Sequence, residues 1–172
     1  MTERARQVPS GFEIRDTLTT YLVKTLQGLE KDAYFFLPKI PVIPDWAGWE
    51  EQAEAQEHGD GLRFYFPYQT FLKVGIDADS LCGRLTELWE SWGWTCSTSR
   101  LGDHYDLVGT SPDAFELVAH GISGQRGFTL LVASPVFEEP TPGDAVAMPF
   151  AVTRDGPRSL SEMQELHPEL FN

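Results

Sequence analysis

Residues 94–134 constrain the fold more than any other part of the sequence, because short apolar runs and turn signals alternate there at a regular spacing. Four strands are predicted, over 94–99, 104–109, 114–120 and 128–134. The signals between them are Gly102-Asp103, Ser111-Pro112-Asp113 and a glycine-rich turn over 121–127. Strands with such short connections pair with their neighbours in sequence, which indicates an antiparallel sheet.

Two helices are predicted upstream, over 12–31 and 78–92, because apolar residues recur there at helical spacing. The apolar row of the first helix is Ile14, Leu18, Tyr21, Leu22, Thr25, Leu26 and Leu29. The row of the second is Leu81, Leu85, Leu88 and Trp92, widened by Cys82 and Trp89. Asp77 is the expected N-cap of the second helix and Gly93 its stop.

Between these helices, residues 62–76 are predicted to form a strand, at an edge or in a hairpin because of Pro67. The resulting order α-β-α-β-β-β lacks the alternation of doubly wound folds, so the class is α+β. We expect an antiparallel sheet of about four to five strands packed by two main helices.

Two proline-rich stretches and two short helices complete the prediction. Residues 33–49 predict an extended segment, because prolines recur at 38, 41 and 44, every third residue. Residues 47–58 predict a short acidic helix. Residues 138–158 are expected to be a connector, followed by a terminal helix over 159–167 with a Ser159–Glu162 capping box. We therefore expect one domain over 1–137 and an acidic tail over 138–172.

The charge of the chain is strongly acidic and localised. Its 172 residues hold 26 acids and 13 bases, a net charge of −13. Such a balance disfavours nucleic-acid binding, which needs a basic face. Residues 45–60 contain six acids and no base, and residues 138–172 contain seven acids and two bases. These clusters either keep the chain dispersed or form a docking surface for a basic protein.

The acidic segment also carries tryptophans, which are frequent anchors of protein interfaces. The candidate partner-binding residues are therefore Trp46, Trp49, Glu50, Glu51, Glu54 and Glu57.

The sequence contains none of the strong signatures of catalysis or metal binding, such as H-E-x-x-H, C-x-x-C or G-x-S-x-G. We accordingly predict no catalytic residue, no metal and no cofactor. The best local polar cluster is Asp103, His104 and Asp106, where a carboxylate beside a histidine could tune a general base. Aspartate is also common at turns for backbone reasons, so these three residues are only pocket candidates.

The cysteines and the N-terminal residues bear on the compartment. Cys82 and Cys96 are expected to be buried free thiols, because the predicted helix and strand offset them along the axis. The first residues lack the apolar stretch of a signal peptide, and no run approaches the length of a membrane span. A cytoplasmic protein that makes no membrane contact is the resulting expectation.

Part of the chain resembles the C-terminal half of small uncharacterised actinobacterial proteins, many of them lipoproteins. The shared features are a helix ending in Trp-x-x-Gly-Trp, a following strand, a Pro-Asp turn and a last strand ending in Ser-Pro. They are matched by Trp89, Trp92, Gly93, Trp94, Asp103, Tyr105, Leu107, Pro112, Asp113, Ser134 and Pro135. The resemblance covers about a third of the chain and implies an α+β fold without implying an activity.

These observations favour a non-enzymatic module that binds a basic protein, with an inhibitor or immunity-type role as its specific form. The alternative is a small-molecule-binding protein or enzyme with a pocket between the sheet and the proline-rich segment. The oligomeric state is left open by the sequence.

Overall fold

The computed structural model describes residues 11–29, 33–36, 55–58, 61–71, 77–125, 128–135 and 149–171. Its helices are α1 (Gly11–Gln27), α3 (Ala78–Ser91) and α4 (Leu160–Leu166), with a short 3-10 helix η1 (Pro168–Leu170). Its strands are β1 (Tyr34–Phe36), β2 (Ala55–His58), β3 (Gly61–Phe71), β4 (Thr95–Leu101), β5 (His104–Thr110), β6 (Glu116–Ile122), β7 (Thr129–Ala133), β8 (Ala151–Thr153) and β9 (Gly156–Arg158).

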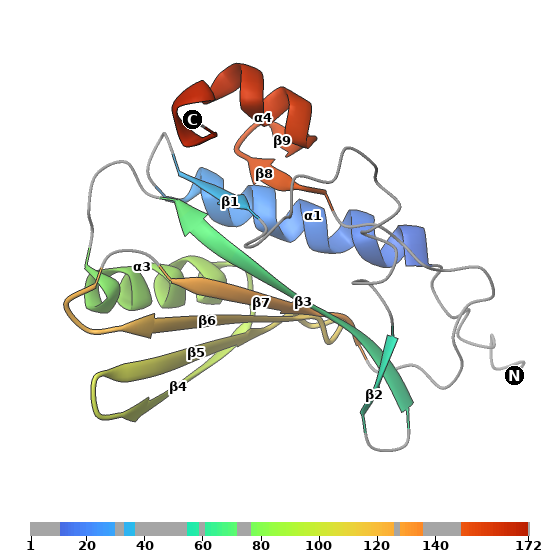
Figure 1. Ribbon diagram of the computed structural model, residues 1–172. Coiled ribbons are helices and arrows are strands. Elements are labelled where there is room, and N and C mark those ends of the chain that lie inside the picture. The colour runs from blue at the N-terminus through green and yellow to red at the C-terminus, as the bar shows by residue number, and fades with distance from the viewer. Residues whose placement is uncertain are drawn as a thin grey trace, which may run out of the picture.

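The nine described strands form an antiparallel sheet in the order β4-β5-β6-β7-β3-β1-β8-β9, with β2 added beside β3 (Figure 1). The α+β class and the four-strand meander β4–β7 are confirmed. The sheet is larger than the predicted four to five strands. Its additional strands, β1, β2, β8 and β9, are only three or four residues long, too short for hydrophobic alternation to reveal them.

Two predicted segments are wrong where the structure describes them. The last four residues of the expected acidic helix form β2, which pairs with β3 in a register that joins His58 to Gly61. The expected connector over 138–158 contains the β8–β9 hairpin, and β8 pairs with β1. Phe150 and Val152 are buried in the same core as the apolar residues of α1. Tertiary packing therefore makes part of this segment a hairpin, although its proline content predicts an irregular connector.

Pro67 lies inside an unbroken strand rather than at a kink. It pairs with Leu131 of β7, while the amide of Thr70 donates to the carbonyl of Phe128. Backbone N–H groups alternate sides along a strand, so the nitrogen of Pro67 faces away from β7. On that side, β2 pairs with β3 only up to Phe64 and β1 only from Gln69. Pro67 lies between these two pairings, where no described strand needs its missing N–H.

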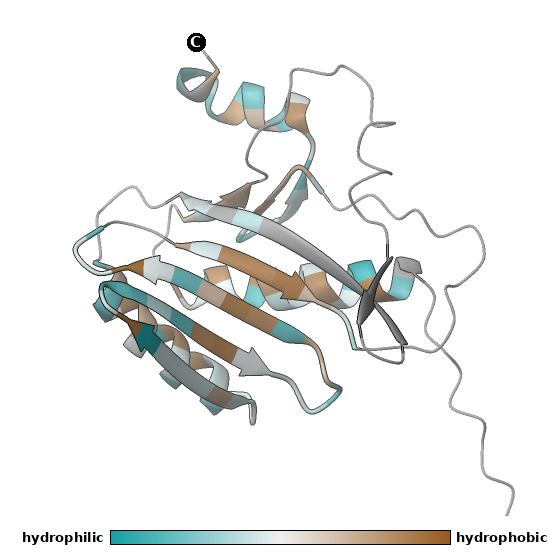
Figure 2. Cartoon of the chain, turned by 60° about the horizontal axis from the view of Figure 1, so that its bottom comes forward, coloured by the Kyte–Doolittle hydropathy of each residue, from teal (hydrophilic) through white to brown (hydrophobic). Residues whose placement is uncertain are grey.

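Both long helices cover one face of the sheet, and Figure 2 shows them behind it, with the near face of β4–β7 bare of helices. The expected apolar row of α1 is buried except for the half-buried Tyr21, and each fully buried leucine contributes about 2 kcal/mol. Trp89 of α3 is fully buried and its indole N–H donates to Thr25 of α1 over 3.1 Å. This bond joins the two helices above the sheet.

The helix ends agree with the predictions except at the end of α1. Asp77 caps α3 by accepting the Ser80 amide, and Gly93 follows with φ of +80°. Ser159 and Glu162 form the predicted capping box of α4. The first helix ends at Gln27 instead of residue 31. The Gly28 amide is shared between the carbonyls of Lys24 and Thr25, and the Leu29 amide donates to the Leu26 carbonyl, so the last turn tightens as helix ends commonly do.

Candidate functional site

The two groups of sequence-predicted site residues have different outcomes. Trp46, Trp49, Glu50, Glu51 and Glu54 lie outside the described residues, so their proposed role remains a prediction. Glu57 lies in β2 rather than on a helix, and the structure describes only its backbone. The pocket candidates Asp103, His104 and Asp106 are all described, at the turn between β4 and β5 and at the start of β5.

The structure pairs Asp106 with a residue that the sequence did not single out. The Nδ1 atom of His120 lies 2.5 Å from the carboxylate of Asp106, and the two residues are partners across β5 and β6. The ring of His104 stacks on that of His120, with centroids 5.7 Å apart. Alternation places His104 and Asp106 on one face of β5, opposite buried Tyr105 and Leu107.

This cluster is exposed and not enclosed. The side chains of His120 and Asp106 are 43% and 47% exposed, and neither residue lines either of two cavities, of about 590 and 320 Å3, that lie among the described residues. Asp103 is a turn residue, and its backbone carbonyl accepts a hydrogen bond from the Ser123 amide. The expectation of a pocket around His104 therefore stays a prediction, because these two cavities do not include it. Only the strand register, which the sequence does not contain, could have linked His120 to Asp106.

Strand β4 forms one edge of the described sheet. Strand β4 is last in the sheet order, and among the described strands it pairs only with β5. A two-residue turn joins the two strands, with Gly102 at φ of +60°. The residues that flank such a turn, here Leu101 and His104, form a backbone hydrogen-bonded pair. Alternation from Leu101 then directs the N–H and C=O groups of Cys96, Thr98 and Arg100 outward.

Helix α3 runs beside this edge and presents a row of polar side chains to it. At one end the guanidinium of Arg100 bonds to Asp79 of α3. In the middle, the Cys82 thiol hydrogen-bonds Thr98 of β4. At the other end lies Glu90, whose charge reaches Cys96. The spacing of Asp79, Cys82, Thr86 and Glu90 places them on one helical face.

The thiols in this row are structural in character. Both cysteines are free, as predicted, but they are half-buried rather than buried. Burial raises the pKa of the Cys82 thiol. Burial, and then the charge of Glu90, raises the pKa of the Cys96 thiol. Neither group is therefore a ready thiolate nucleophile at neutral pH.

The opposite edge of the sheet differs. Strand β9 has only three residues, and Pro157 lies at its centre. Short edge strands and prolines are the usual protection against pairing with another chain. Strand β4 has seven residues and no proline, lysine or acid, and its one charged side chain is already bonded to Asp79. The β4 edge, meaning Thr95–Leu101 together with Cys82, Thr86 and Glu90 of α3, is the candidate site.

Comparisons with protein-family models, curated proteins and solved structures found no match. The resemblance to small actinobacterial proteins accordingly stays a prediction. Within the described ranges, no helix combines the length and the apolar character that crossing a bilayer requires.

Proposed function

We propose that this protein is a non-enzymatic binding module that takes up an extended, basic segment of a protein partner as an additional strand beside β4. The observation that carries the proposal is the β4 edge, which no described strand covers, next to a polar face of α3 that carries Glu90. An added strand would bond to the outward groups of Cys96, Thr98 and Arg100, which supply affinity without regard to sequence.

The basic character of the partner follows from the charges beside the edge. Alternate side chains of an added strand would face α3, where Glu90 lies near Cys96. Strand β4 itself carries no acid, and the charge of Arg100 is matched by Asp79. A lysine or arginine near Glu90 would add specificity more than affinity, since exposed ion pairs contribute only about 0.2–1 kcal/mol.

The test uses a labelled seven-residue peptide of alternating Lys and Thr, with a Glu–Thr peptide of equal length as control. Fluorescence anisotropy should show binding of the Lys peptide alone. Thr98→Pro removes an outward N–H while leaving the bonds to β5 in place, and should weaken binding about tenfold or more. Thr98→Ala, which keeps the N–H, should bind like the parent chain.

Three outcomes would overturn this proposal. Equal binding of both peptides removes the charge argument, and unchanged binding by Thr98→Pro removes β4 as the site. Sedimentation of the protein as a dimer that Thr98→Pro dissociates would identify a second copy as the occupant. Circular dichroism of each variant confirms that it is folded before binding is measured.

The acidic segment predicted from the sequence is tested separately. Replacement of Glu50, Glu51 and Glu54 by Lys should leave binding at β4 intact if the edge alone recognises the peptide. Loss of binding in this variant but not in Thr98→Pro would move the partner-binding site to residues 45–60.

A further inference from the structure

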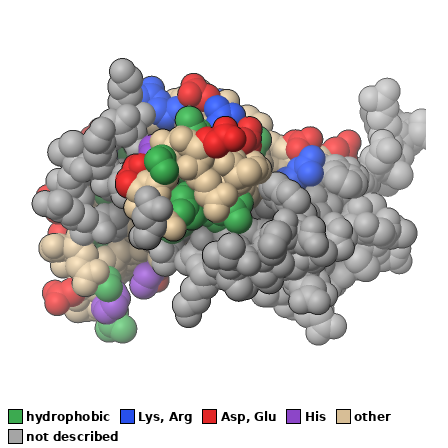
Figure 3. Space-filling view, turned by 45° about the horizontal axis from the view of Figure 1, so that its top comes forward, with side chains coloured by type: hydrophobic (Ala, Val, Ile, Leu, Met, Phe, Trp, Pro, Cys, Tyr) green, Lys and Arg blue, Asp and Glu red, His purple; other side chains and the backbone are tan. Residues whose placement is uncertain are grey.

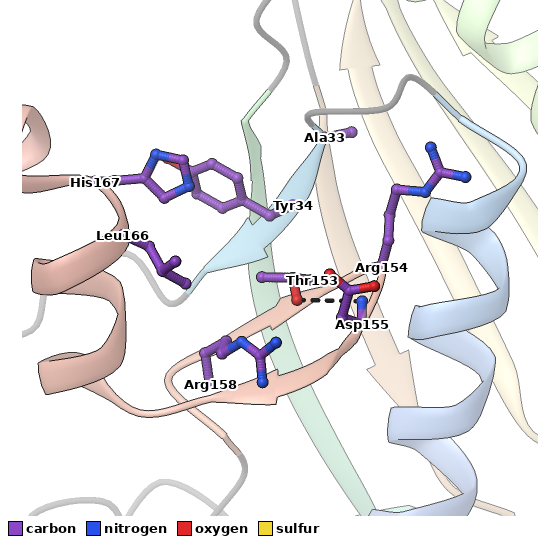
Figure 4. A pocket seen from close by; sticks show the side chains of 8 residues that line it. All are labelled: Ala33, Tyr34, Thr153, Arg154, Asp155, Arg158, Leu166 and His167. Carbon is purple, nitrogen blue, oxygen red and sulfur yellow. Dashed lines mark hydrogen bonds between the residues drawn. The ribbon is translucent and has the colours of Figure 1, made fainter.

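A cavity of about 590 Å3 lies at the opposite end of the molecule from β4, where the β8–β9 hairpin, the start of β1 and the end of α4 meet. Figure 4 shows the rings of Tyr34 and His167 face to face on one side and the hairpin side chains across from them. This volume is in the range of sites for small organic molecules, about 300–1,000 Å3.

Two arginines of the hairpin, Arg154 and Arg158, line this cavity. Other described arginines have partners in the fold: Arg15 pairs with Asp16, and Arg100 with Asp79. Within the described ranges, neither Arg154 nor Arg158 forms an ion pair, although the chain has twice as many acids as bases. Asp155 is the one carboxylate among the described lining residues.

The charge of Arg158 interacts only weakly with Glu162, outside the cavity. It contributes to the lowered pKa of Glu162, but the larger causes are hydrogen bonds from Ser159 to that carboxylate. The one hydrogen bond described for the Arg158 guanidinium goes to the neighbouring Pro157 carbonyl, at 3.4 Å. In Figure 3, Lys and Arg side chains lie at the top of the view, beside acidic ones. The cavity thus holds more positive than negative charge.

The aromatic wall of the cavity adds no negative charge. The Tyr34 and His167 rings are stacked with centroids 5.1 Å apart. Burial, and then the nearby Glu169, raises the pKa of Tyr34 to about 12, so its phenol stays neutral at physiological pH. His167 Nδ1 lies 3.2 Å from Glu169, which leaves Nε2 as the other polar atom of the ring.

The hairpin that carries the arginines is held in place. The Thr153 hydroxyl donates to the Gly156 carbonyl over 3.1 Å and accepts the Asp155 amide. The side chain of Gln27 in α1 donates to the Arg154 carbonyl over 3.2 Å. A backbone fixed in this way lowers the ordering cost of binding.

We propose that this cavity binds a small organic oxyanion, a molecule with a carboxylate or phosphate group held by Arg154 and Arg158 and an apolar part toward Leu166 and the aromatic wall. Guanidinium groups match the planar and bidentate geometry of such oxyanions. A neighbouring cavity of about 320 Å3 shares Arg158, but Asp16 and Glu162 line it together with Arg15. Its balanced charges do not favour an anion.

Isothermal titration calorimetry with inorganic phosphate, phenyl phosphate and benzoate tests the proposal. At least one of the two ring-bearing anions should bind more tightly than inorganic phosphate, and the tighter one identifies phosphate or carboxylate as the preferred group. The double variant Arg154→Gln/Arg158→Gln should lose about tenfold or more in affinity. Arg84→Gln is the matched control, because that arginine lies on α3 and donates to the Gly28 carbonyl.

A second variant separates charge recognition from structural damage. Asp155→Asn removes the opposing carboxylate and should strengthen binding of the same anion, opposite to the arginine variants. Absence of heat with all three anions, or equal binding by the double variant, would overturn the proposal. Equal weakening by Arg84→Gln would do so too, since it would show only unspecific charge attraction.

Discussion

The two ends of the sheet are built differently. At the α3 end, over β4–β7, aromatic side chains fill the space between helix and sheet. A Cβ atom on Gly109 would clash with the Trp89 ring, and one on Gly121 would clash with Tyr105. At the hairpin end, β1, β8, β9 and α4 enclose a cavity with arginines on its wall.

This difference separates stability from binding. Glycine at positions 109 and 121 lets the large rings of Trp89 and Tyr105 lie directly on the strand backbone, so this end of the core is closely packed. The arginines of the hairpin form no described ion pair that would stabilise the fold. The α3 end should therefore respond to changes in volume, and the hairpin end to changes in charge.

The largest effect is expected for Trp89→Ala. The indole is fully buried, stacks on Trp94 with centroids 5.9 Å apart and bonds to Thr25. Its removal should lower the free energy of unfolding by about 4 kcal/mol, measured by urea denaturation. Trp92→Ala is the control, because Trp92 is only partly buried. Equal losses in both variants would contradict the central role of Trp89.

Gly109→Ala should cost about 2–3 kcal/mol, because its methyl group overlaps the fixed Trp89 ring. Gly83→Ala is a matched control with the opposite sign. Apart from the nearby backbone of α3 itself, no atom lies within 4 Å of its added methyl group, and the change should stabilise α3 by about 0.5–1 kcal/mol. In the double variant Gly109→Ala/Trp89→Leu, the cost should be smaller than the sum of the single changes. Additive costs would show that the clash is relieved elsewhere.

The α3 end was also the more predictable from the sequence. The Asp77 cap, the Gly102-Asp103 turn and the periodicity of α1 are local signals, and each matches the structure. The hairpin end depends on pairing between residues far apart, such as Phe35 with Val152. A three-residue strand has too little alternation to be recognised before its partner is known.

The candidate sites, like the hairpin, depend on contacts between residues far apart in the sequence. The sequence drew attention to His104 and Asp106 because they are two residues apart in the chain, but the partner of Asp106 is His120, fourteen residues away. The exposed backbone of β4 is visible only when the order of strands is known, and the arginine cavity only when α4 has docked. Charge counts could not find the cavity, since the segment containing it is acidic overall.

The pH dependence of stability should also differ between variants at the α3 end. Hydrogen bonds from Ser80 lower the pKa of Asp77 below its usual value. A carboxyl with a lowered folded-state pKa stabilises the fold above its unfolded pKa, near 3.9, and this contribution is lost as the pH falls through the folded value. Asp77→Asn keeps a capping oxygen without the charge. The stability difference between the two chains should therefore shrink below about pH 4, as followed by thermal melting at each pH. A constant difference would exclude a role for the charge.

The smallest effect on stability is expected for the arginine variant of the cavity, which should have a large effect on anion binding. Arg154→Gln/Arg158→Gln should change the free energy of unfolding by about 0.5 kcal/mol or less, because the two side chains have no described ion pair to lose. Addition of the anion that binds most tightly should raise the melting temperature of the parent chain and leave this variant unchanged. Gly109→Ala should start from a lower melting temperature but show the same rise, since its damage lies at the other end of the sheet. A destabilised arginine variant would instead mean that these side chains hold the hairpin, and the division between a packed end and a binding end would not stand.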